Sequence, residues 1–306
     1  MSVIGFDTSN YTTSIAWFDG INGENVSKLL PVKEGELGLR QSDAVFAHIK
    51  SLPELSGRLF SLTRKDIRAV GVSTRPRAVE GSYMPCFMVG YTHAKLLSDS
   101  LGLPLIEVSH QQGHVAASLW SAGRLDLMDT PHLAWHLSGG TTELLLVEPD
   151  GKNVRCTRIG GTSDISAGQL IDRTGQMLKL PFPSGKHLDA LSRQGTGTDV
   201  FRVKCPSFEF SLSGVQNKVQ QFHERSVDAA ETAAYALRCV AEAVYKATEN
   251  ALKAYPGLEV VFSGGVASNS MLREVIQPLK PIFSEPQFST DNAMGVAVLT
   301  HRILEG

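Results

Sequence analysis

Residues 2–20 read SVIGFDTSNYTTSIAWFDG, and residues 132–151 read HLAWHLSGGTTELLLVEPDG. Each stretch is a short apolar strand, a turn of small polar residues, and a second apolar strand that ends in Asp-Gly. Such a turn exposes backbone N–H groups that can hold an anion such as phosphate, although one alone is usually an ordinary hairpin. Two copies, about 130 residues apart, predict a duplicated α/β domain that closes on a nucleotide from both sides.

The composition sets limits on the class of protein. The chain has 306 residues, of which 42% are hydrophobic, and this is enough for two domains with well-formed cores. A formal net charge of -2 and a pI near 6.5 exclude a basic surface over the whole molecule, so contact with nucleic acid must be local or shared with a partner. Asp7 interrupts the first apolar run, and we expect no signal peptide, no membrane helix and a cytoplasmic location. The four cysteines have no CxxC spacing and are expected to be reduced thiols.

Apolar periodicity predicts three strands followed by alternating helices and strands, in an order that occurs twice. The expected strands are 3–6, 13–18, 26–32, 67–73, 105–108, 133–137, 143–147, 154–159, 259–262 and 281–283. The expected helices are 42–62, 86–100, 110–122, 166–178, 227–254, 268–279 and 292–304.

This layout is that of the actin and sugar-kinase superfold. We therefore predict an α/β protein of two actin-like (ASKHA, RNase H-like) domains with an interdomain nucleotide cleft. The first domain is expected at 1–131, with the C-terminal helix 292–306 packing on it, and the second at 132–291. A stretch rich in Gly, Pro, Ser and Phe, at about 181–224, is interpreted as an insertion that lines the cleft.

A pair of histidines is the first candidate for chemistry. His110 and His114 are four residues apart in SHQQGHVAASLW, which places both imidazoles on one helix face, close enough to share a metal. The residue after the first histidine is Gln111, which cannot act as a general base, so a zinc peptidase is disfavoured. Asp291 precedes the final helix, where it would either cap that helix or ligate the same metal. His136, at the end of a strand, is either a core residue or directed toward the adjacent glycine turn.

A second group of residues could bind a nucleotide. Ser263-Gly264-Gly265 follows an apolar strand and precedes a helix, whose N–H groups favour anions, and we expect this turn to face Ser138–Gly140 across the cleft. Asn269 would bond a base or ribose, or would cap its helix. Asp172 would accept ribose hydroxyls or pair with a neighbouring arginine, and Gly185 would let a sugar ring approach closely.

In this order, the motifs resemble those of the TsaD family of tRNA N6-threonylcarbamoyladenosine transferases, also called the glycoprotease or YgjD-like family. The resemblance covers almost the whole chain, through DTS, HQQGH, LSGGTTELL, SAGQLIDRTGQML, PFPSG, FEFSLSGVQ, FSGGVASN and STDNAMG. It implies an acyltransferase that moves the threonylcarbamoyl group from threonylcarbamoyl-AMP to N6 of the adenosine that follows the anticodon. It also implies one divalent metal, iron before zinc, and an adenylate substrate or ATP.

Site residues follow from this resemblance position by position. The implied metal ligands are His110, His114 and Asp291, with His136 at a position where some family members have a tyrosine ligand. The implied adenylate site comprises His136, Leu137, Ser138, Gly139, Gly140, Asp172, Gly185 and Asn269. No covalent nucleophile is required, because the tRNA amine attacks directly.

The chain departs from the family pattern in three places. Tyr11-Thr12 replaces an Asp-Glu pair, Thr141 replaces His or Asn, and 75–81 replaces a glycine-proline loop. These changes indicate a divergent paralogue. The alternatives are therefore a divergent carbamoyltransferase, an ATP-dependent kinase of the same fold, and a nucleotide-binding partner subunit without catalysis.

The expected partners are tRNA, bound weakly by the chain alone, and the other proteins of a threonylcarbamoylation complex. The dense basic cluster, either a tRNA contact or solvated surface charge, comprises Arg64, Lys65, Arg68, Arg75 and Arg77.

Overall fold

The computed structural model describes residues 1–9, 11–31, 39–62 and 66–306. The chain divides into two compact units. The first contains Met1–Pro131, Glu148–Cys156 and Asp291–Gly306, and the second contains His132–Val147 and Thr157–Thr290.

The first unit is built on a five-stranded sheet with the order β3-β2-β1-β4-β5. Strands β1 (Ser2–Asp7), β2 (Thr12–Phe18) and β3 (Gly23–Leu29) form an antiparallel meander, and β4 (Ile67–Arg75) and β5 (Leu105–Ser109) continue the sheet in parallel. All six residues of β1 are buried, which is the pattern of a strand covered on both faces.

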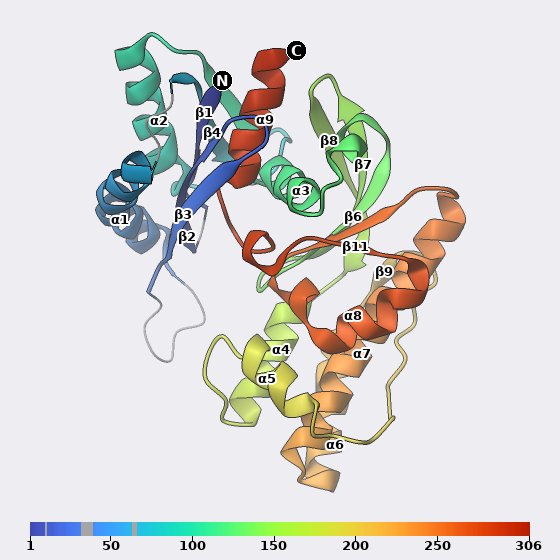
Figure 1. Cartoon of the computed structure of the whole chain (residues 1–306). Coiled ribbons are helices and arrows are strands. Elements are labelled where there is room, and N and C mark those ends of the chain that lie inside the picture. The colour runs from blue at the N-terminus through green and yellow to red at the C-terminus, as the bar shows by residue number, and fades with distance from the viewer. Residues whose placement is uncertain (10, 32–38, 63–65) are drawn as a thin grey trace. The chain divides into compact units, whose positions relative to one another are not determined.

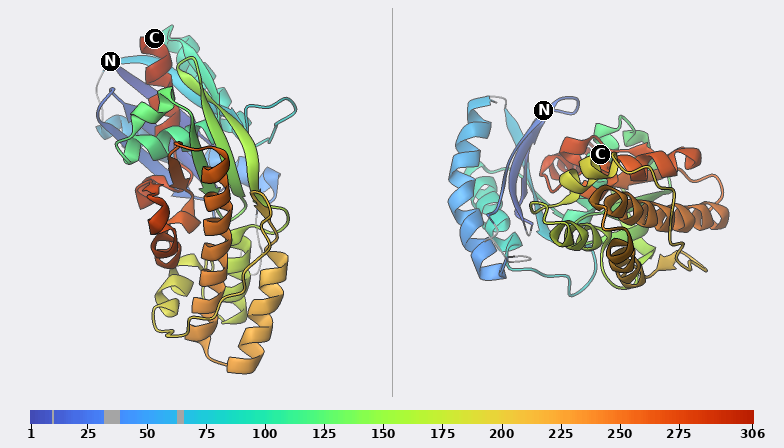
Figure 2. Two further views of the ribbon diagram at one scale, coloured as in Figure 1. Left: turned by 90° about the vertical axis from the view of Figure 1, so that its right-hand side faces the viewer. Right: turned by 90° about the horizontal axis from the view of Figure 1, so that it is seen from below.

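Helices cover both faces of this sheet (Figures 1 and 2). Helices α1 (Gln41–Leu62) and α2 (Phe87–Leu101) lie on one face, and their apolar residues share a core with Ile4 and Phe6 of β1. Helices α3 (His110–Ser121) and α9 (Met294–Glu305) lie on the other face, and a short 3₁₀ helix, η1 (Leu125–Asp129), follows α3. The C-terminal helix therefore packs on the sheet formed by the first residues of the chain.

The second unit is built on a six-stranded sheet with the order β11-β10-β6-β7-β8-β9. Its long helix α7 (Ala229–Ala254) shares a core with the sheet. The strands are β6 (His132–Leu137), β7 (Thr142–Asp150), β8 (Asn153–Thr162), β9 (Glu209–Phe210), β10 (Val260–Ser263) and β11 (Ile282–Phe283). The other helices are α4 (Ala167–Met177), α5 (Gly185–Ser192), α6 (Ser213–Ser226), α8 (Ser270–Ile276), η2 (Gly265–Ser268), η3 (Gln277–Leu279) and η4 (Pro286–Phe288).

The predicted α/β class is confirmed, and several details of the sequence prediction are corrected. The stretch 181–224, interpreted as an insertion that lines the cleft, contains α5, β9 and most of α6, none of which was predicted. The predicted helix 268–279 is divided among η2, α8 and η3. Among the described helices, none is both long and apolar enough to cross a membrane.

Candidate functional site

The histidine pair lies at the start of α3, in the first unit. Ser109 and Gln112 form a capping box: the Ser109 hydroxyl accepts from the Gln112 amide, and the Gln112 side chain accepts from the Ser109 amide. This fixes the first turn of the helix, so His110 is its first residue and His114 lies one turn later on the same face. The two rings meet edge to face, with centroids 4.3 Å apart.

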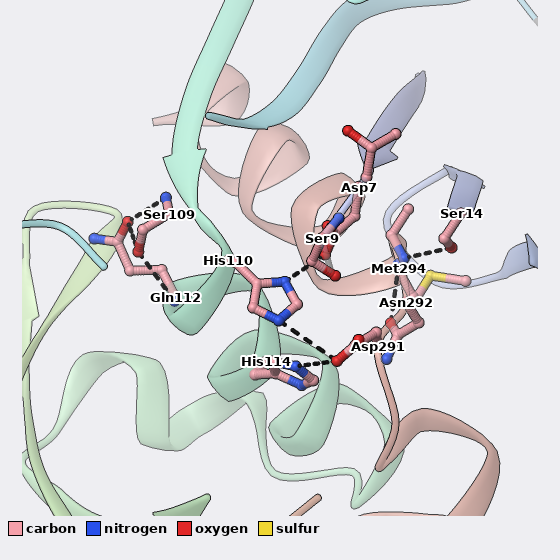
Figure 3. A network of polar contacts seen from close by, with 12 residues as sticks. Asp7, Ser9, Ser14, Ser109, His110, Gln112, His114, Asp291, Asn292 and Met294 are labelled. Atoms are coloured by element: carbon pink, nitrogen blue, oxygen red, sulfur yellow. Dashed lines mark hydrogen bonds and ion pairs between the residues drawn. The ribbon is translucent and has the colours of Figure 1, made fainter. Parts of the chain in front are cut away.

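Asp291 joins these histidines from the segment before α9. Ala293, two residues after Asp291, anchors this segment. Its backbone amide donates to the Ser14 hydroxyl of β2 and to the Asn25 side-chain oxygen of β3. Asp291 does not cap the helix, since α9 begins at Met294 after Ala293. Its Oδ1 instead lies 3.1 Å from His114 Nε2 and 3.5 Å from His110 Nε2 (Figure 3).

A second carboxylate, that of Asp7, holds His110 from the other side (Figure 3). Asp7 Oδ2 lies 2.6 Å from His110 Nδ1, and the Asp7 side chain is 2% exposed. Burial disfavours a charged imidazole, but the Asp7 and Asp291 carboxylates outweigh that effect and raise the pKa of His110 to about 10. In turn, hydrogen bonds from His110 and His114 outweigh burial and hold the pKa of Asp291 well below its usual range.

This donor set suits a divalent metal. One ligand atom from each of His110, His114 and Asp291 lies within 4.8 Å of the others. Two imidazoles and a carboxylate leave further coordination positions open, as in catalytic sites of zinc and of iron. A carboxylate behind a ligating histidine is a common partner that fixes the ring and its tautomer. Here the Asp7 carboxylate accepts a hydrogen bond from His110 Nδ1. His110 Nε2 is therefore left to face the two other candidate ligands, His114 and Asp291.

The first glycine turn lies in the second unit, at the carboxyl end of β6. Ser138 and Thr141 close it, because the Ser138 amide donates to the Thr141 carbonyl and the Thr141 amide donates to the Ser138 hydroxyl. A Cβ built at Gly139 or Gly140 would meet no atom within 4 Å, so the turn is open on its outer side. The residue before it, Leu137, is buried.

The second glycine turn lies beside the first, not opposite it as predicted. Strands β6 and β10 are parallel neighbours, with Ser263 beside His136, so their carboxyl ends and the turns that follow share one edge of the sheet. Gly264 has a φ of +90°, and a Cβ there would lie 2.2 Å from the Leu137 carbonyl oxygen. Only glycine fits this approach.

Both candidate ribose contacts have partners within the protein, and for Asn269 this partner is the helix cap that the sequence offered as the alternative. The Asn269 Oδ1 accepts from the Leu272 amide as the N-cap of α8. The Asp172 carboxylate accepts a hydrogen bond at 2.8 Å from the backbone amide of Ser184, the residue before Gly185. Among the described residues it forms no ion pair with an arginine. Burial raises the pKa of Asp172 although the Ser184 amide opposes this shift.

Sequence reasoning missed Asp189, on α5. Its Oδ1 accepts from the Asn269 side chain at 2.9 Å and from the amide and hydroxyl of Ser270. Its Oδ2 pairs with Arg193. The i, i+4 spacing from Gly185 to Asp189 was a signal for one helix face, but the helix itself was not predicted.

The remaining predicted residues are placed individually. His136 lies on β6, paired in register with Glu143 of β7. Within the basic cluster, Arg68 pairs with Asp66 at 2.7 Å and Arg75 ends β4. The Arg77 amide donates to the Ser82 hydroxyl in the turn that follows. The other two members, Arg64 and Lys65, lie outside the described residues.

Comparison with solved structures defines the class of fold. HypF, in its phosphate- and nucleotide-bound form, superposes with a TM-score of 0.64 at 17% identity, over 100% of this chain and 47% of HypF. The ROK hexokinase of Thermus thermophilus gives a TM-score of 0.55 at 15% identity, with both chains covered completely. The chain therefore has the actin-like, ASKHA fold that its sequence predicted.

Comparison of sequences then gives the family. The model for TsaD, tRNA N6-adenosine threonylcarbamoyltransferase, matches residues 40–298, and the chain belongs to this family. The tRNA N6-adenosine threonylcarbamoyltransferase of Thermosipho africanus is 31% identical over 324 residues, covering 99% of this chain and 94% of the relative. That of Carboxydothermus hydrogenoformans is 33% identical over 266 residues, covering 83% and 77%. The family predicted from the motifs is confirmed.

Proposed function

We propose that this chain transfers the threonylcarbamoyl group of threonylcarbamoyl-AMP to N6 of the adenosine next to the anticodon, on its 3′ side, in tRNA. The observation that carries the proposal is the TsaD family match over residues 40–298, a range that contains both histidines, both glycine turns and Asp291. The enzyme is thus proposed to be an acyltransferase that needs a divalent metal.

His110, His114 and Asp291 would hold the metal, which we propose to be Fe²⁺, with Zn²⁺ as the alternative. When bound, such an ion supplies a Lewis acid for a carbonyl or phosphoryl oxygen. Asp7 keeps the proton of His110 on Nδ1 and so presents Nε2 to the ion. On the resemblance alone, His136 would be a further ligand.

The adenylate is proposed to bind the second unit. Backbone amides of Ser138–Gly140 would bond its phosphate, and would stabilise the charge that develops on AMP as it leaves. Asp172 and Asn269 would bond the ribose or base, and Gly185 would allow the sugar to approach. His136 and Leu137, which lead into the turn, would complete this site.

The partners are proposed to be tRNA and further proteins. A chain with a net charge of -2 attracts a polyanion weakly, because phosphate contacts supply most of the affinity. Partner proteins would therefore supply charge or geometry, and the reaction would take place in the cytoplasm. Among the described members of the basic cluster, Arg75 and Arg77 would be the first to be tested for contact with tRNA.

The deciding experiment is nucleoside analysis of tRNA from cells that lack this protein. Loss of threonylcarbamoyladenosine, restored by the wild-type gene and not by His114→Ala, supports the proposal. Unchanged modification would contradict it. The departure at Tyr11-Thr12 favours a second candidate, a carbamoyltransferase with a different acceptor, and in that case labelled carbamoyl adenylate would lose its label to a molecule other than tRNA.

A further inference from the structure

We propose that Ser166 is a positioning residue that sets the direction of the Gly140 amide in the first glycine turn, so that this amide can receive the phosphate of an adenylate. The proposal rests on the proposed function, because it assigns a role within that adenylate site. Ser166 is the N-cap of α4, and its side chain is buried against the turn.

The Ser166 hydroxyl makes two hydrogen bonds with different roles. It accepts from the Gln169 amide at 3.0 Å, which caps α4. It donates to the Gly139 carbonyl oxygen at 2.6 Å. A serine hydroxyl has one proton and two acceptor positions. The single proton of Ser166 is therefore used in the hydrogen bond to the Gly139 carbonyl.

That second bond fixes a peptide plane. The Gly139–Gly140 peptide is trans, since the described cis bond is at Phe182-Pro183. In a trans peptide the C=O and the N–H point in opposite directions. With the Gly139 carbonyl held toward Ser166, the Gly140 N–H must point away from α4.

The amides of the turn are available for a ligand. Within the part of the chain that the structure describes, neither the Gly139 N–H nor the Gly140 N–H has a hydrogen-bond acceptor. Both glycines are exposed. Two successive glycines would otherwise let this peptide rotate freely, because glycine populates both signs of φ.

Two further contacts hold the start of α4 against the turn. A Cβ at Gly168 would lie 2.5 Å from both the Gly139 Cα and the Ser138 carbonyl oxygen. The Ala167 amide donates to the Thr142 hydroxyl at 2.8 Å. These contacts bring the helix start to the turn, and the Ser166 proton then selects the orientation of one peptide.

Two substitutions test the bond from Ser166 to the Gly139 carbonyl. Ser166→Gly removes both bonds of the hydroxyl, but glycine is itself tolerated as an N-cap residue, so the loss of the bond to the Gln169 amide has little effect on α4. Ser166→Thr keeps both bonds and serves as the matched control. Calorimetry with AMP and with adenosine, which lacks the phosphate, gives the phosphate contribution for the full-length wild type and both variants.

The ratio of AMP affinity to adenosine affinity should fall about three- to tenfold in Ser166→Gly, the size of one hydrogen bond, and Ser166→Thr should restore it. The Gly140 amide resonance of the free protein should shift in the glycine variant and return in the threonine variant. An unchanged ratio in Ser166→Gly overturns the role of Ser166 alone. A wild type that binds neither AMP nor adenosine overturns the proposed adenylate site as well.

Discussion

Asp7 Oδ2 lies 2.6 Å from His110 Nδ1, and this links the first strand of the chain to the first residue of α3. The two residues are 103 positions apart in sequence. The Asp7 Oδ1 accepts from the Ser9 amide at 2.8 Å, so both oxygens of this buried carboxylate are used. A metal-binding histidine would thus be oriented by a residue that a rigid strand holds in place.

Replacement of Asp7 should weaken metal binding without removing a ligand. Asp7→Asn keeps the size of the side chain but can present an NH₂ group to His110 Nδ1, which disturbs the tautomer that leaves Nε2 free. Loss of such a partner typically lowers metal affinity about 10- to 100-fold. Competition with a chelator measures the affinity. Asp99→Asn, at an exposed ion pair on α2, is the control, and equal affinity in Asp7→Asn and wild type would refute the role of Asp7.

Substitution of a proposed metal-binding histidine should remove the metal, whereas substitution of another histidine should not. His114→Ala removes a donor atom that lies 3.1 Å from Asp291, and the purified variant should retain little or no metal by elemental analysis. His93, on α2, bonds the Val89 carbonyl within its own helix, so His93→Ala should keep the wild-type metal content. A wild type that takes up neither Fe²⁺ nor Zn²⁺ would exclude the site.

The two glycine turns should respond differently to valine. Gly139→Val introduces a Cβ into open space, so the protein should stay folded while the branched side chain obstructs a phosphate. Gly264→Val should destabilise the fold by more than about 1 kcal/mol, because a left-handed φ and a close carbonyl both exclude a side chain. Thermal unfolding and AMP calorimetry test this contrast. If Gly139→Val binds AMP normally, the assignment of the first turn is wrong.

Asp164 should make stability depend on pH. Burial opposes its charge, but hydrogen bonds from Ser211, Leu212 and Ser213 outweigh that effect and hold its pKa well below the usual range. A lowered folded pKa stabilises the fold above the ordinary aspartate value near 3.9, and this stability is lost as pH falls toward the folded pKa.

Asp164→Asn should therefore lower the Tm at pH 7, and its difference from the wild type should shrink below about pH 4. Asp150→Asn, at an exposed position of β7, should show neither effect. A Tm difference for Asp164→Asn that is constant from pH 7 to pH 3 would show that charge is not the cause.

Sequence predicted the elements whose local signals agree with their tertiary environment. The meander of β1 to β3 was predicted because apolar runs alternate with turn residues, and α3 because its apolar residues recur with helical periodicity. Helix α6 was missed because its buried residues are only Val215 and Val219, so its sequence is polar almost all round.

The candidate site, like the fold, could be predicted only in part from the sequence. His110, His114 and Asp291 could be assembled from motif resemblance, since each stands in a recognisable segment. Asp7 stands in the DTS motif, but its role, like that of Asp189, could not be predicted, because these roles depend on contacts made across 103 and 80 positions of sequence. Neither spacing nor periodicity carries that information. The adjacency of the two glycine turns likewise depends on the pairing of β6 with β10.

Asp189 should affect nucleotide binding through Asn269. Asp189→Asn removes the negative charge that accepts from the Asn269 side chain and from Ser270, so the proposed base or ribose contact would lose its orientation. We expect AMP affinity to fall about tenfold, the cost of a hydrogen bond to a charged group. Arg193→Gln is the matched control, because it removes only the exposed partner of Asp189 Oδ2 and leaves the Oδ1 contacts intact. Calorimetry with adenosine should show the same loss as AMP in Asp189→Asn, since this contact does not involve phosphate. If the arginine variant weakens binding as strongly as the aspartate variant, the effect arises from the surface ion pair and not from the orientation of Asn269.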